Sequence, residues 1–460
     1  MPSRPNIVLI LADDMGYGDF GAFGDGSAAT PALDRLVAEG VCLAQHYAGS
    51  PVCAPSRAAI LTGRYPHRTG AIDTFEARGL DRLATREVTA ADLFRRAGYA
   101  TGLVGKWHLG ALDARYHPNA RGFDEFAGFC GGWQDYYDWR LDRNGDFKKA
   151  DGRYLTDVLT EEAVSFVERR ACGPFFLHLA YNAPHFPFQA PEEEVAPFRE
   201  TGRFTRAVAT IYAMVRRMDA GIARVLDALE RKGVAHNTLV LFASDNGPQL
   251  RGRGENSTAR FNCNFHGEKG NTYEGGIRVP AVVRWPDGLD AGRHRDEMTH
   301  FTDWLPTLAA AANVEIPREL SLDGGDVLPV LRGEGGTVET RRFWQWNRYE
   351  PVVTCNAAMR DGDWKLVRPV IAEAMATDPE EGRRDRALKY EPETFTDIIR
   401  GPFPPREIPP PPPAELYNIA RDPGETHDLA REEPARAARM LRELETWFER
   451  VEAERRTIRD

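Results

Sequence analysis

The sequence predicts an α/β protein in which a mostly parallel sheet is covered by helices on both faces. Short apolar, β-rich segments alternate with segments of helical periodicity, the pattern typical of this class. Near residue 335 this alternation stops, and a hairpin pattern and a proline-rich stretch follow. The 460 residues are also too many for one ordinary core. We therefore expect an α/β domain over residues 1–335 and a smaller C-terminal α+β subdomain with an antiparallel sheet over residues 336–460.

The predicted elements follow one another in a regular order. Strands are expected at residues 6–12, 101–105, 175–181, 238–244 and 277–284. Helices are expected at residues 31–39, 56–62, 89–97, 155–169, 206–231 and 302–312. In the C-terminal part, residues 357–367 predict a hairpin, 415–418 a strand and 433–452 a helix. The polar, Pro-rich segment between hairpin and strand, which ends in prolines 409–413, is expected to be a surface loop.

Composition and charge exclude several classes of protein. The net charge of −10 argues against nucleic acid as a main partner, because phosphate binding requires clustered Lys and Arg. No apolar run is long enough to span a bilayer. The apolar segment 7–12 begins too close to Met1 to leave room for a signal peptide, so we expect a cytoplasmic protein. The six cysteines are scattered, which favours reduced thiols.

Two predicted strands end in polar pairs that could hold a cation. Asp13 and Asp14 close the first strand, and Asp245 and Asn246 close the strand at 238–244. Each pair alone fits a solvated turn as well as a metal site. Together they offer hard oxygen ligands, which suit calcium or magnesium rather than zinc.

Basic residues follow other strands of the same predicted sheet. Lys106 and His108 lie just after the strand at 101–105, and His185 follows the strand at 175–181 within a proline-rich loop. Lys269 lies in a Gly-rich loop before the last strand of the set. The lysine segment is not a nucleotide-binding loop, because its spacing is too short and no Ser or Thr follows Lys106. Since ligands bind at the carboxyl ends of strands in open α/β sheets, we expect acidic and basic groups to converge on one site.

The segment Cys53-Ala54-Pro55-Ser56-Arg57, followed by Leu61-Thr62-Gly63-Arg64, carries the most specific signal in the chain. With the pairs above, Ala183-Pro184-His185 and the Lys269…Glu274-Gly275-Gly276-x-Arg278 segment, it resembles type I sulfatases along nearly the whole chain. The C-terminal segments 360–366 and 416–425 are also similar to that family. The resemblance implies an alkaline-phosphatase-like core and hydrolysis of an aryl or carbohydrate sulfate ester. It also implies that a separate maturation enzyme oxidises Cys53 to formylglycine, whose hydrate attacks sulfur.

The resemblance further assigns roles to individual residues. It implies that calcium, or alternatively magnesium, is held by Asp13, Asp14, Asp245, Asn246 and the modified Cys53. Arg57 and His108 would position and deprotonate the hydrate, Lys106 and Lys269 would bind sulfate oxygens, and His185 or Lys269 would assist the leaving oxygen. Proton transfer of this kind is typically worth ~10²–10⁴ in rate.

The half of the pocket that receives the alcohol is less defined. Arylsulfatases of the family use a serine in the loop at 128–132, and this chain has none there. Aromatic and polar residues nearby are candidates for substrate contact: Trp133, Asp135, His266, Arg278 and Trp346. The sequence names neither the ester nor the oligomeric state.

Three other functions compete with a sulfate esterase. A phosphonate monoester or phosphodiester hydrolase shares the cysteine signature, but in those enzymes a histidine typically follows the second metal aspartate, where this chain has Asn246. A sulfamidase acting on N-sulfated sugars is a second alternative. A non-catalytic metal- or anion-binding relative is the third, and the full set of polar positions argues against it.

Overall fold

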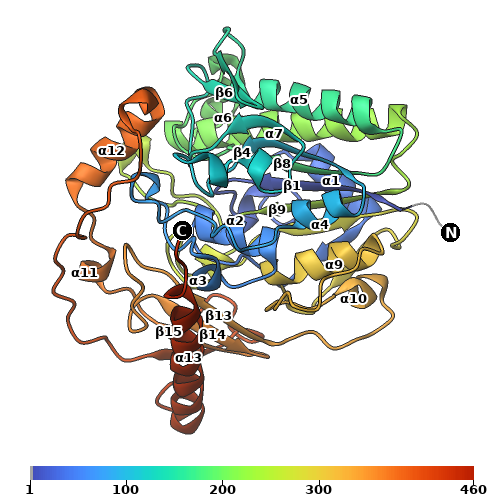
Figure 1. Cartoon of the computed structure of the whole chain (residues 1–460). Coiled ribbons are helices and arrows are strands. Elements are labelled where there is room, and N and C mark those ends of the chain that lie inside the picture. Colours follow the sequence, from blue (N-terminus) through green and yellow to red (C-terminus); the bar gives the residue numbers. More distant parts are fainter. Residues whose placement is uncertain (1–3) are drawn as a thin grey trace.

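A ten-stranded sheet forms the centre of the computed structural model, which describes residues 4–460 (Figure 1). The strands lie in the order β11-β2-β10-β9-β1-β8-β4-β5-β6-β7. Their bounds, in that order, are Arg293–Arg295, Val41–Leu43, Ala281–Arg284, Thr238–Ser244, Asn6–Ala12, Phe175–Ala180, Ala100–Lys106, Glu125–Phe129, Arg140–Arg143 and Asp146–Lys149. The five strands from β9 to β5 are parallel, whereas β10, β6 and β7 join as antiparallel partners.

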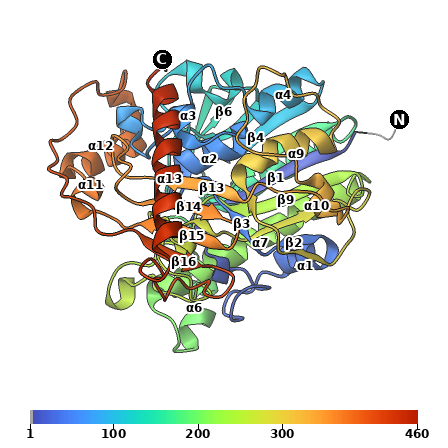
Figure 2. The same ribbon diagram turned by 90° about the horizontal axis from the view of Figure 1, so that it is seen from below.

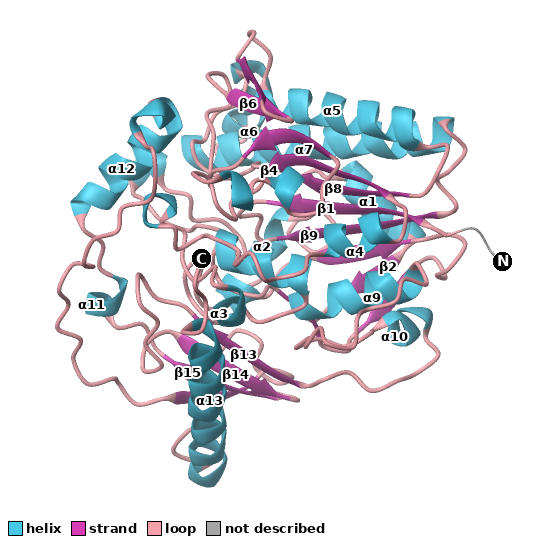
Figure 3. Cartoon of the chain, in the orientation of Figure 1, coloured by secondary structure: helices cyan, strands magenta, loops and turns pink. Residues whose placement is uncertain are grey.

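Helices of the N-terminal part cover this sheet, and those from residue 372 onward belong to the C-terminal part. In chain order the helices are α1 (Pro31–Glu39), α2 (Cys53–Thr62), α3 (Pro66–Thr69), α4 (Ala90–Arg96), α5 (Leu155–Arg170), α6 (Glu192–Glu200), α7 (Arg206–Arg231), α8 (Glu274–Ile277), α9 (Trp304–Ala311), α10 (Leu328–Arg332), α11 (Ala372–Met375), α12 (Pro379–Tyr390) and α13 (Pro434–Arg455). Figure 3 shows that α5 and α7 lie on one side of the sheet and α4 and α9 on the other. The fold class expected from the alternation of strands and helices is confirmed.

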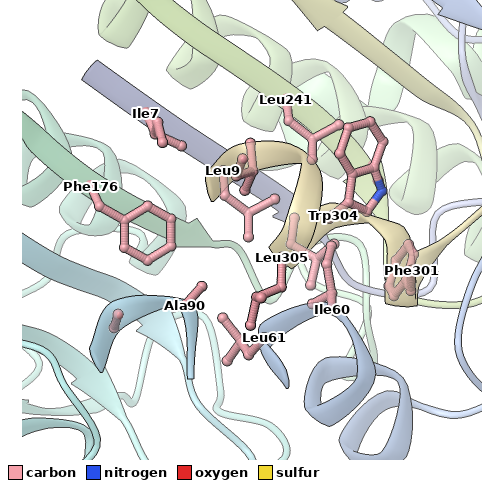
Figure 4. Packing of buried hydrophobic residues seen from close by; sticks show 14 of the residues in the cluster. Ile7, Leu9, Ile60, Leu61, Ala90, Phe176, Leu241, Phe301, Trp304 and Leu305 are labelled. Carbon is pink, nitrogen blue, oxygen red and sulfur yellow. The ribbon is translucent and has the colours of Figure 1, made fainter. Parts of the chain in front are cut away.

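The central strand β1 shows why the sheet needs cover on both faces. All its side chains are buried, and successive residues point to opposite faces of the sheet. Ile7 and Leu9 join the core that contains α2, α4 and α9, whereas Val8 and Ile10 join the core that contains α1, α5 and α7. Figure 4 shows the first of these cores, to which Leu9 of β1 and Trp304 and Leu305 of α9 all contribute. The sequence of a strand that is buried on both faces is a continuous apolar run, which is typical of parallel sheets.

The C-terminal part forms a second, antiparallel sheet. Its strands are β13 (Arg341–Gln345), β14 (Ala357–Asp361), β15 (Trp364–Arg368) and β16 (Glu415–Asn418), paired in that order. Helix α13 lies across this sheet (Figure 2). Its buried residues Met440, Leu444, Trp447 and Val451 follow helical spacing and pack on the sheet. A separate pair, β3 (His46–Tyr47) with β12 (Thr299–His300), completes the strands.

Three elements differ from the sequence predictions. The strand expected at 277–284 is only Ala281–Arg284, because residues 274–277 form the short helix α8, and it runs antiparallel to β9. The helix expected at 56–62 begins three residues earlier, at Cys53. The loop expected before prolines 409–413 contains α11 and α12. None of the helices in residues 4–460 is both long enough and apolar enough to cross a membrane.

Candidate active site

Polar residues from four neighbouring strands meet at one rim of the large sheet. Asp13 and Asp14 follow β1, and Asp245 follows β9 directly beside it, so that the Asp14 backbone N–H donates to Asp245 Oδ1 at 3.2 Å. Lys106, the last residue of β4, reaches Asp13 Oδ2 with its Nζ at 2.6 Å. From the loop after β8, His185 places its Nε2 3.7 Å from Asp14 Oδ2. These side chains span more than 230 positions of the chain, from Asp13 to Asp245, and they share one site because parallel strands end on the same side.

Cys53 is the first residue of α2 and lies at this rim. Its Sγ is 3.3 Å from Asp13 Oδ1 and 4.0 Å from Asp14 Oδ1. The N-terminus of a helix favours negative charge, which suits an oxyanion at this position. The thiol itself is different, because burial and the neighbouring Asp13 raise its pKa well above the usual value. A thiol that stays protonated is a poor nucleophile.

Arg57 connects α2 to the carboxylates. Its Nε and Nη2 both bond Asp245 Oδ2, at 2.9 and 2.7 Å, and its Nη1 donates to the Lys106 carbonyl at 3.2 Å. Arg57 Nη2 is also 3.7 Å from Asp13 Oδ1. The guanidinium and both carboxylates are almost completely buried. The double hydrogen bond between Arg57 and Asp245 therefore fixes one face of the cluster.

Positive charges offset the buried carboxylates. Burial alone would raise the pKa of Asp13, but Lys106 and the other nearby cations outweigh it and hold that pKa below the usual range. Asp14 behaves in the same way beside Lys269, whose Nζ is 2.7 Å from it. In contrast, burial and the charge of Asp13 raise the pKa of Asp245 to about 6. Of the three carboxylates, Asp245 is thus the one whose charged form is least favoured by its surroundings.

The donor atoms of this cluster fit a hard divalent cation. Asp13, Asp14, Cys53 and His185 each offer one ligand atom, and these atoms lie within 4.8 Å of one another. Asn246 Nδ2 donates to Asp14 Oδ1 at 2.7 Å. The buried Oδ1 of Asn246 has no hydrogen-bond partner among residues 4–460. Carboxylate and amide oxygens around one point are the ligands of calcium or magnesium.

His108 lies beside the cluster under unusual constraint. Its backbone φ is 57°, in the left-handed region. This conformation is unfavourable for a residue other than glycine, so contacts with the surrounding structure must maintain it. The ring is buried, and neither nitrogen has a hydrogen-bond partner in the described chain. Burial and the charges of Lys106, Lys389 and Arg57 lower its pKa well below the usual value, so the ring is neutral and can accept a proton.

The tautomer of His185 follows from its backbone contact. Its Nδ1 is 2.5 Å from the Phe186 carbonyl oxygen, which can only accept, so Nδ1 carries the proton. The Nε2 atom therefore faces the cluster without a proton in the neutral ring. Burial and the charge of Lys269 lower the pKa of His185 to about 4.

A cavity of about 450 Å³ opens above Cys53. Besides the cysteine, the residues that line it include His108, Trp133, His185, Lys269 and Arg348. Trp133, which the sequence predicted as a candidate for substrate contact, is thus a lining residue of this cavity. Its Nε1 donates to Asp385 Oδ2 at 2.8 Å.

The other four predicted contacts do not line this cavity. Asp135 accepts from Gln189 and from the backbone of its own loop, and His266 is exposed and stacked on Tyr273. Arg278 is held by the Ala44 carbonyl and Glu274. Trp346 is buried beneath Arg348. In the described chain their geometry thus gives no support to a direct contact with substrate.

Several lining residues were missed by the sequence predictions. Glu381, Asp385 and Arg386 come from α12, and Glu76 comes from the segment after α3. Glu76 accepts from Lys389 of α12 and from the Gly132 N–H, at 2.6 Å for the latter. The segment of α12 has no apolar face to reveal it, since its residues are mostly charged.

The sheet, its rim of carboxylates and lysines, and the cysteine at a helix N-terminus define a hydrolase of the alkaline phosphatase superfamily. Comparison with known proteins gives the family. The sulfatase family matches residues 5–314, and the C-terminal part of N-sulphoglucosamine sulphohydrolase matches residues 265–378. The chain belongs to the sulfatase family, whose members are hydrolases of sulfuric esters.

Individual relatives agree with this assignment. The chain is 34% identical to mouse steryl-sulfatase over 450 aligned positions, which cover 79% of this chain and 69% of that protein. It is 36% identical to human N-acetylgalactosamine-6-sulfatase over 363 aligned positions, covering 72% of this chain and 66% of that protein. The crystal structure of Ps i-CgsB in complex with k-i-k-neocarrahexaose superposes with a TM-score of 0.80 at 32% identity, covering 97% and 93% of the two chains.

One structural neighbour is a phosphonate monoester hydrolase, the class of enzyme considered above as an alternative. Phosphonate monoester hydrolase of Agrobacterium radiobacter has a TM-score of 0.64 and 22% identity, covering 98% of this chain and 96% of that one. A likeness at this level shows the shared fold alone, and the family match favours sulfate esters.

Proposed function

We propose that this chain hydrolyses a sulfate ester, with Cys53 as the precursor of the nucleophile, to an alcohol and inorganic sulfate. The observation that carries this proposal is the position of Cys53 at the N-terminus of α2, within 3.3 Å of Asp13 and beside two lysine–aspartate pairs. The two ammonium groups would attract an anion at residue 53, and the carboxylates that they contact would hold a cation. Transfer of a sulfate or phosphate group needs this combination, and the family match favours sulfate.

The residues present fit both groups that the family uses. A divalent cation would be held by Asp13, Asp14, Asp245, Asn246 and the modified residue 53, and it would polarise the sulfate oxygens. Formylglycine, made from Cys53 by a separate maturation enzyme, would supply a hydroxyl nucleophile. The unpartnered Asn246 Oδ1 supports the cation, because a buried amide oxygen without a donor is rare unless an ion or water binds it.

The protein's own side chains would divide the remaining work. Lys106 and Lys269 bind sulfate oxygens, and their charge stabilises the transferring group. Arg57 keeps Asp245 and the N-terminal turn of α2 in place through its double contact. His108, neutral and unpartnered, accepts the proton from the nucleophile.

Protonation of the leaving oxygen has two candidate donors. Lys269 keeps its proton, because although burial opposes its charge, Asp14 raises its pKa above the usual value. His185 would donate from Nε2 after that atom is protonated. Both line the cavity above Cys53.

The decisive experiment begins with the state of residue 53. Mass spectrometry of the peptide that contains it should show the aldehyde, after co-expression with a formylglycine-generating enzyme. That protein should release sulfate from at least one member of a panel of saccharide, aryl and steryl sulfates. Cys53→Ala should abolish release, whereas Cys42→Ala, a change at another buried cysteine in β2, should retain it.

The same panel tests the alternatives. A phenyl phosphonate turned over faster than every sulfate would favour the phosphonate hydrolase. An N-sulfated glucosamine turned over faster than every sulfate ester would favour the sulfamidase. Fully modified protein that hydrolyses none of them would contradict catalysis.

A further inference from the structure

Arg348 is a lining residue of the Cys53 cavity to which no step of the hydrolysis has been assigned. Its guanidinium lies over two aromatic rings, with Cζ 4.6 Å from the centroid of Phe75 and 4.9 Å from that of Trp346. Stacking on two rings fixes the plane of a guanidinium and removes much of its rotational freedom. The side chain is therefore preorganised before any ligand arrives.

One edge of this guanidinium is anchored. Nη1 donates to Asp73 Oδ1 and to Thr74 Oγ1, both at 2.8 Å. Asp73 is completely buried and is itself fixed by the Tyr349 N–H at 3.0 Å and by Trp346 Nε1 at 3.3 Å. The carboxylate offsets the charge of Arg348, so the pair as a whole is close to neutral.

The other edge keeps unused hydrogen-bond donors. Within residues 4–460, neither Nε nor Nη2 of Arg348 has a hydrogen-bond partner, and the side chain remains 24% exposed. A rigid, charge-compensated donor at the wall of a cavity suits an uncharged acceptor oxygen better than it suits an apolar surface.

The acidic residues of the same wall are already engaged. Asp385 accepts from Trp133, Glu381 from Arg78 and Glu76 from Lys389. Within residues 4–460 none of these carboxylates contacts Arg348, although Glu76 Oε2 has no hydrogen-bond partner, and together they make this part of the cavity polar. An apolar alcohol such as a sterol would bury the free Nε and Nη2 of Arg348 without giving them hydrogen-bond partners.

We propose that Arg348 determines substrate specificity by donating from Nε and Nη2 to ring or hydroxyl oxygens of a sugar in the alcohol half of the substrate. This inference rests on the proposed sulfate-ester hydrolysis. Trp133 provides an apolar surface in the same cavity, as sugar rings require. The substrate class is therefore a saccharide sulfate rather than a steryl sulfate.

The test compares KM, kcat and product inhibition in the modified enzyme. For Arg348→Ala, KM for the best saccharide sulfate should rise about 10-fold or more while kcat changes less. The inhibition constant of inorganic sulfate, which fills only the sulfate half of the site, should stay within about 2-fold of the wild-type value. Arg348→Lys keeps the charge but loses the planar fork, so its KM should lie close to that of the alanine variant.

Two further variants separate recognition from folding. Asp73→Asn combined with Arg348→Met removes the buried carboxylate charge together with its partner, and it should show the same rise in KM without unfolding. Arg436→Ala removes an arginine that stacks on Trp364 in the C-terminal part of the chain, at 4.2 Å, and it should change neither constant.

The outcomes that overturn the inference are distinct from those that overturn the proposed function. An unchanged saccharide KM, an equal weakening of sulfate inhibition, or a wild-type preference for steryl sulfate would each overturn the role of Arg348 while leaving hydrolysis intact. Modified enzyme that turns over no sulfate ester would instead overturn the proposed function itself.

Discussion

Lys389 of α12 forms a buried ion pair with Glu76, which lies between α3 and α4. The side chains are 4% and 1% exposed, and Glu76 Oε1 is also 3.9 Å from His108 Nε2. Glu76 lines both the cavity above Cys53 and a neighbouring cavity of about 340 Å³, which Lys389 lines as well. This pair therefore joins the C-terminal part of the chain to the wall of the site.

Lys389→Met should destabilise the protein by about 3–5 kcal/mol, the usual cost of leaving a buried charge without its partner. Burial already raises the pKa of Glu76, and Lys389 is the main group that opposes this effect. The free energy of unfolding in urea is the measurement. Glu76→Gln combined with Lys389→Met should recover much of the loss, and equal stability of the wild type and the single variant would contradict the pair's importance.

Gly132→Ala should lower kcat by about 10–100-fold through displacement of His108. A Cβ at residue 132 would lie 2.6 Å from His108 Cε1 and 2.9 Å from Glu76 Oε1, which is too close for either to stay in place. Steady-state kinetics on the best sulfate ester is the check. Gly173→Ala, where a Cβ meets nothing within 4 Å, is the matched control. An unchanged kcat in Gly132→Ala would show that His108 has no positional role.

Asp81 should make the folded protein less stable as the pH rises. Burial, with the nearby Glu76, raises the pKa of Asp81 from 3.8 to about 7. Between these values the folded state keeps a proton that the unfolded state loses, so stability falls with rising pH by up to ~1.4 kcal/mol per unit and levels off above the folded pKa.

Asp81→Asn should abolish this contribution while its amide oxygen still accepts from the Gly110 N–H. Thermal unfolding should then show a variant that is more stable than the wild type above pH ~7 and similar to it near pH ~4. Asp290→Asn, at an exposed acid, should leave the pH profile unchanged. If the stability of the wild type and of Asp81→Asn changed with pH in parallel, the raised pKa of Asp81 would be contradicted.

Calcium or magnesium should raise the melting temperature of the wild type, because a ligand that binds only the folded state stabilises it by mass action, by ~2.7 kcal/mol at one hundred times Kd. Asp14→Asn should greatly reduce this shift, and a chelator should reverse it. Asp142→Asn, which alters an acid paired with His117 away from Cys53, should retain it. A wild-type melting temperature that responds to neither cation would argue against the metal site.

Much of the α/β core could be predicted from the sequence. The bounds of β1, β9, α1 and α7 agree with the expected ranges, because a buried parallel strand is a continuous apolar run and an amphipathic helix has a clear period. The antiparallel direction of β10 could not be predicted, since an apolar segment carries no sign of the direction in which it pairs.

The candidate site shows the same division. Strand ends and the Cys53 motif predicted that acidic and basic residues would share one rim, because this follows from local pattern and the topology of a parallel sheet. The outer wall could not be predicted. α12 has no apolar stripe, and its attachment through Lys389, Glu381 and Asp385 depends on partners far away in the chain.

The family, the core and the residues next to Cys53 could be predicted from the amino-acid sequence, because they depend on short motifs and on periodic burial. Which other residues line the cavity above Cys53 became clear only from the tertiary structure. Arg348 acquires its fixed orientation only when Asp73 and Phe75 fold against it. Charged side chains can pair with many partners, so only the folded arrangement selects which charges compensate one another and which donors remain free for a ligand.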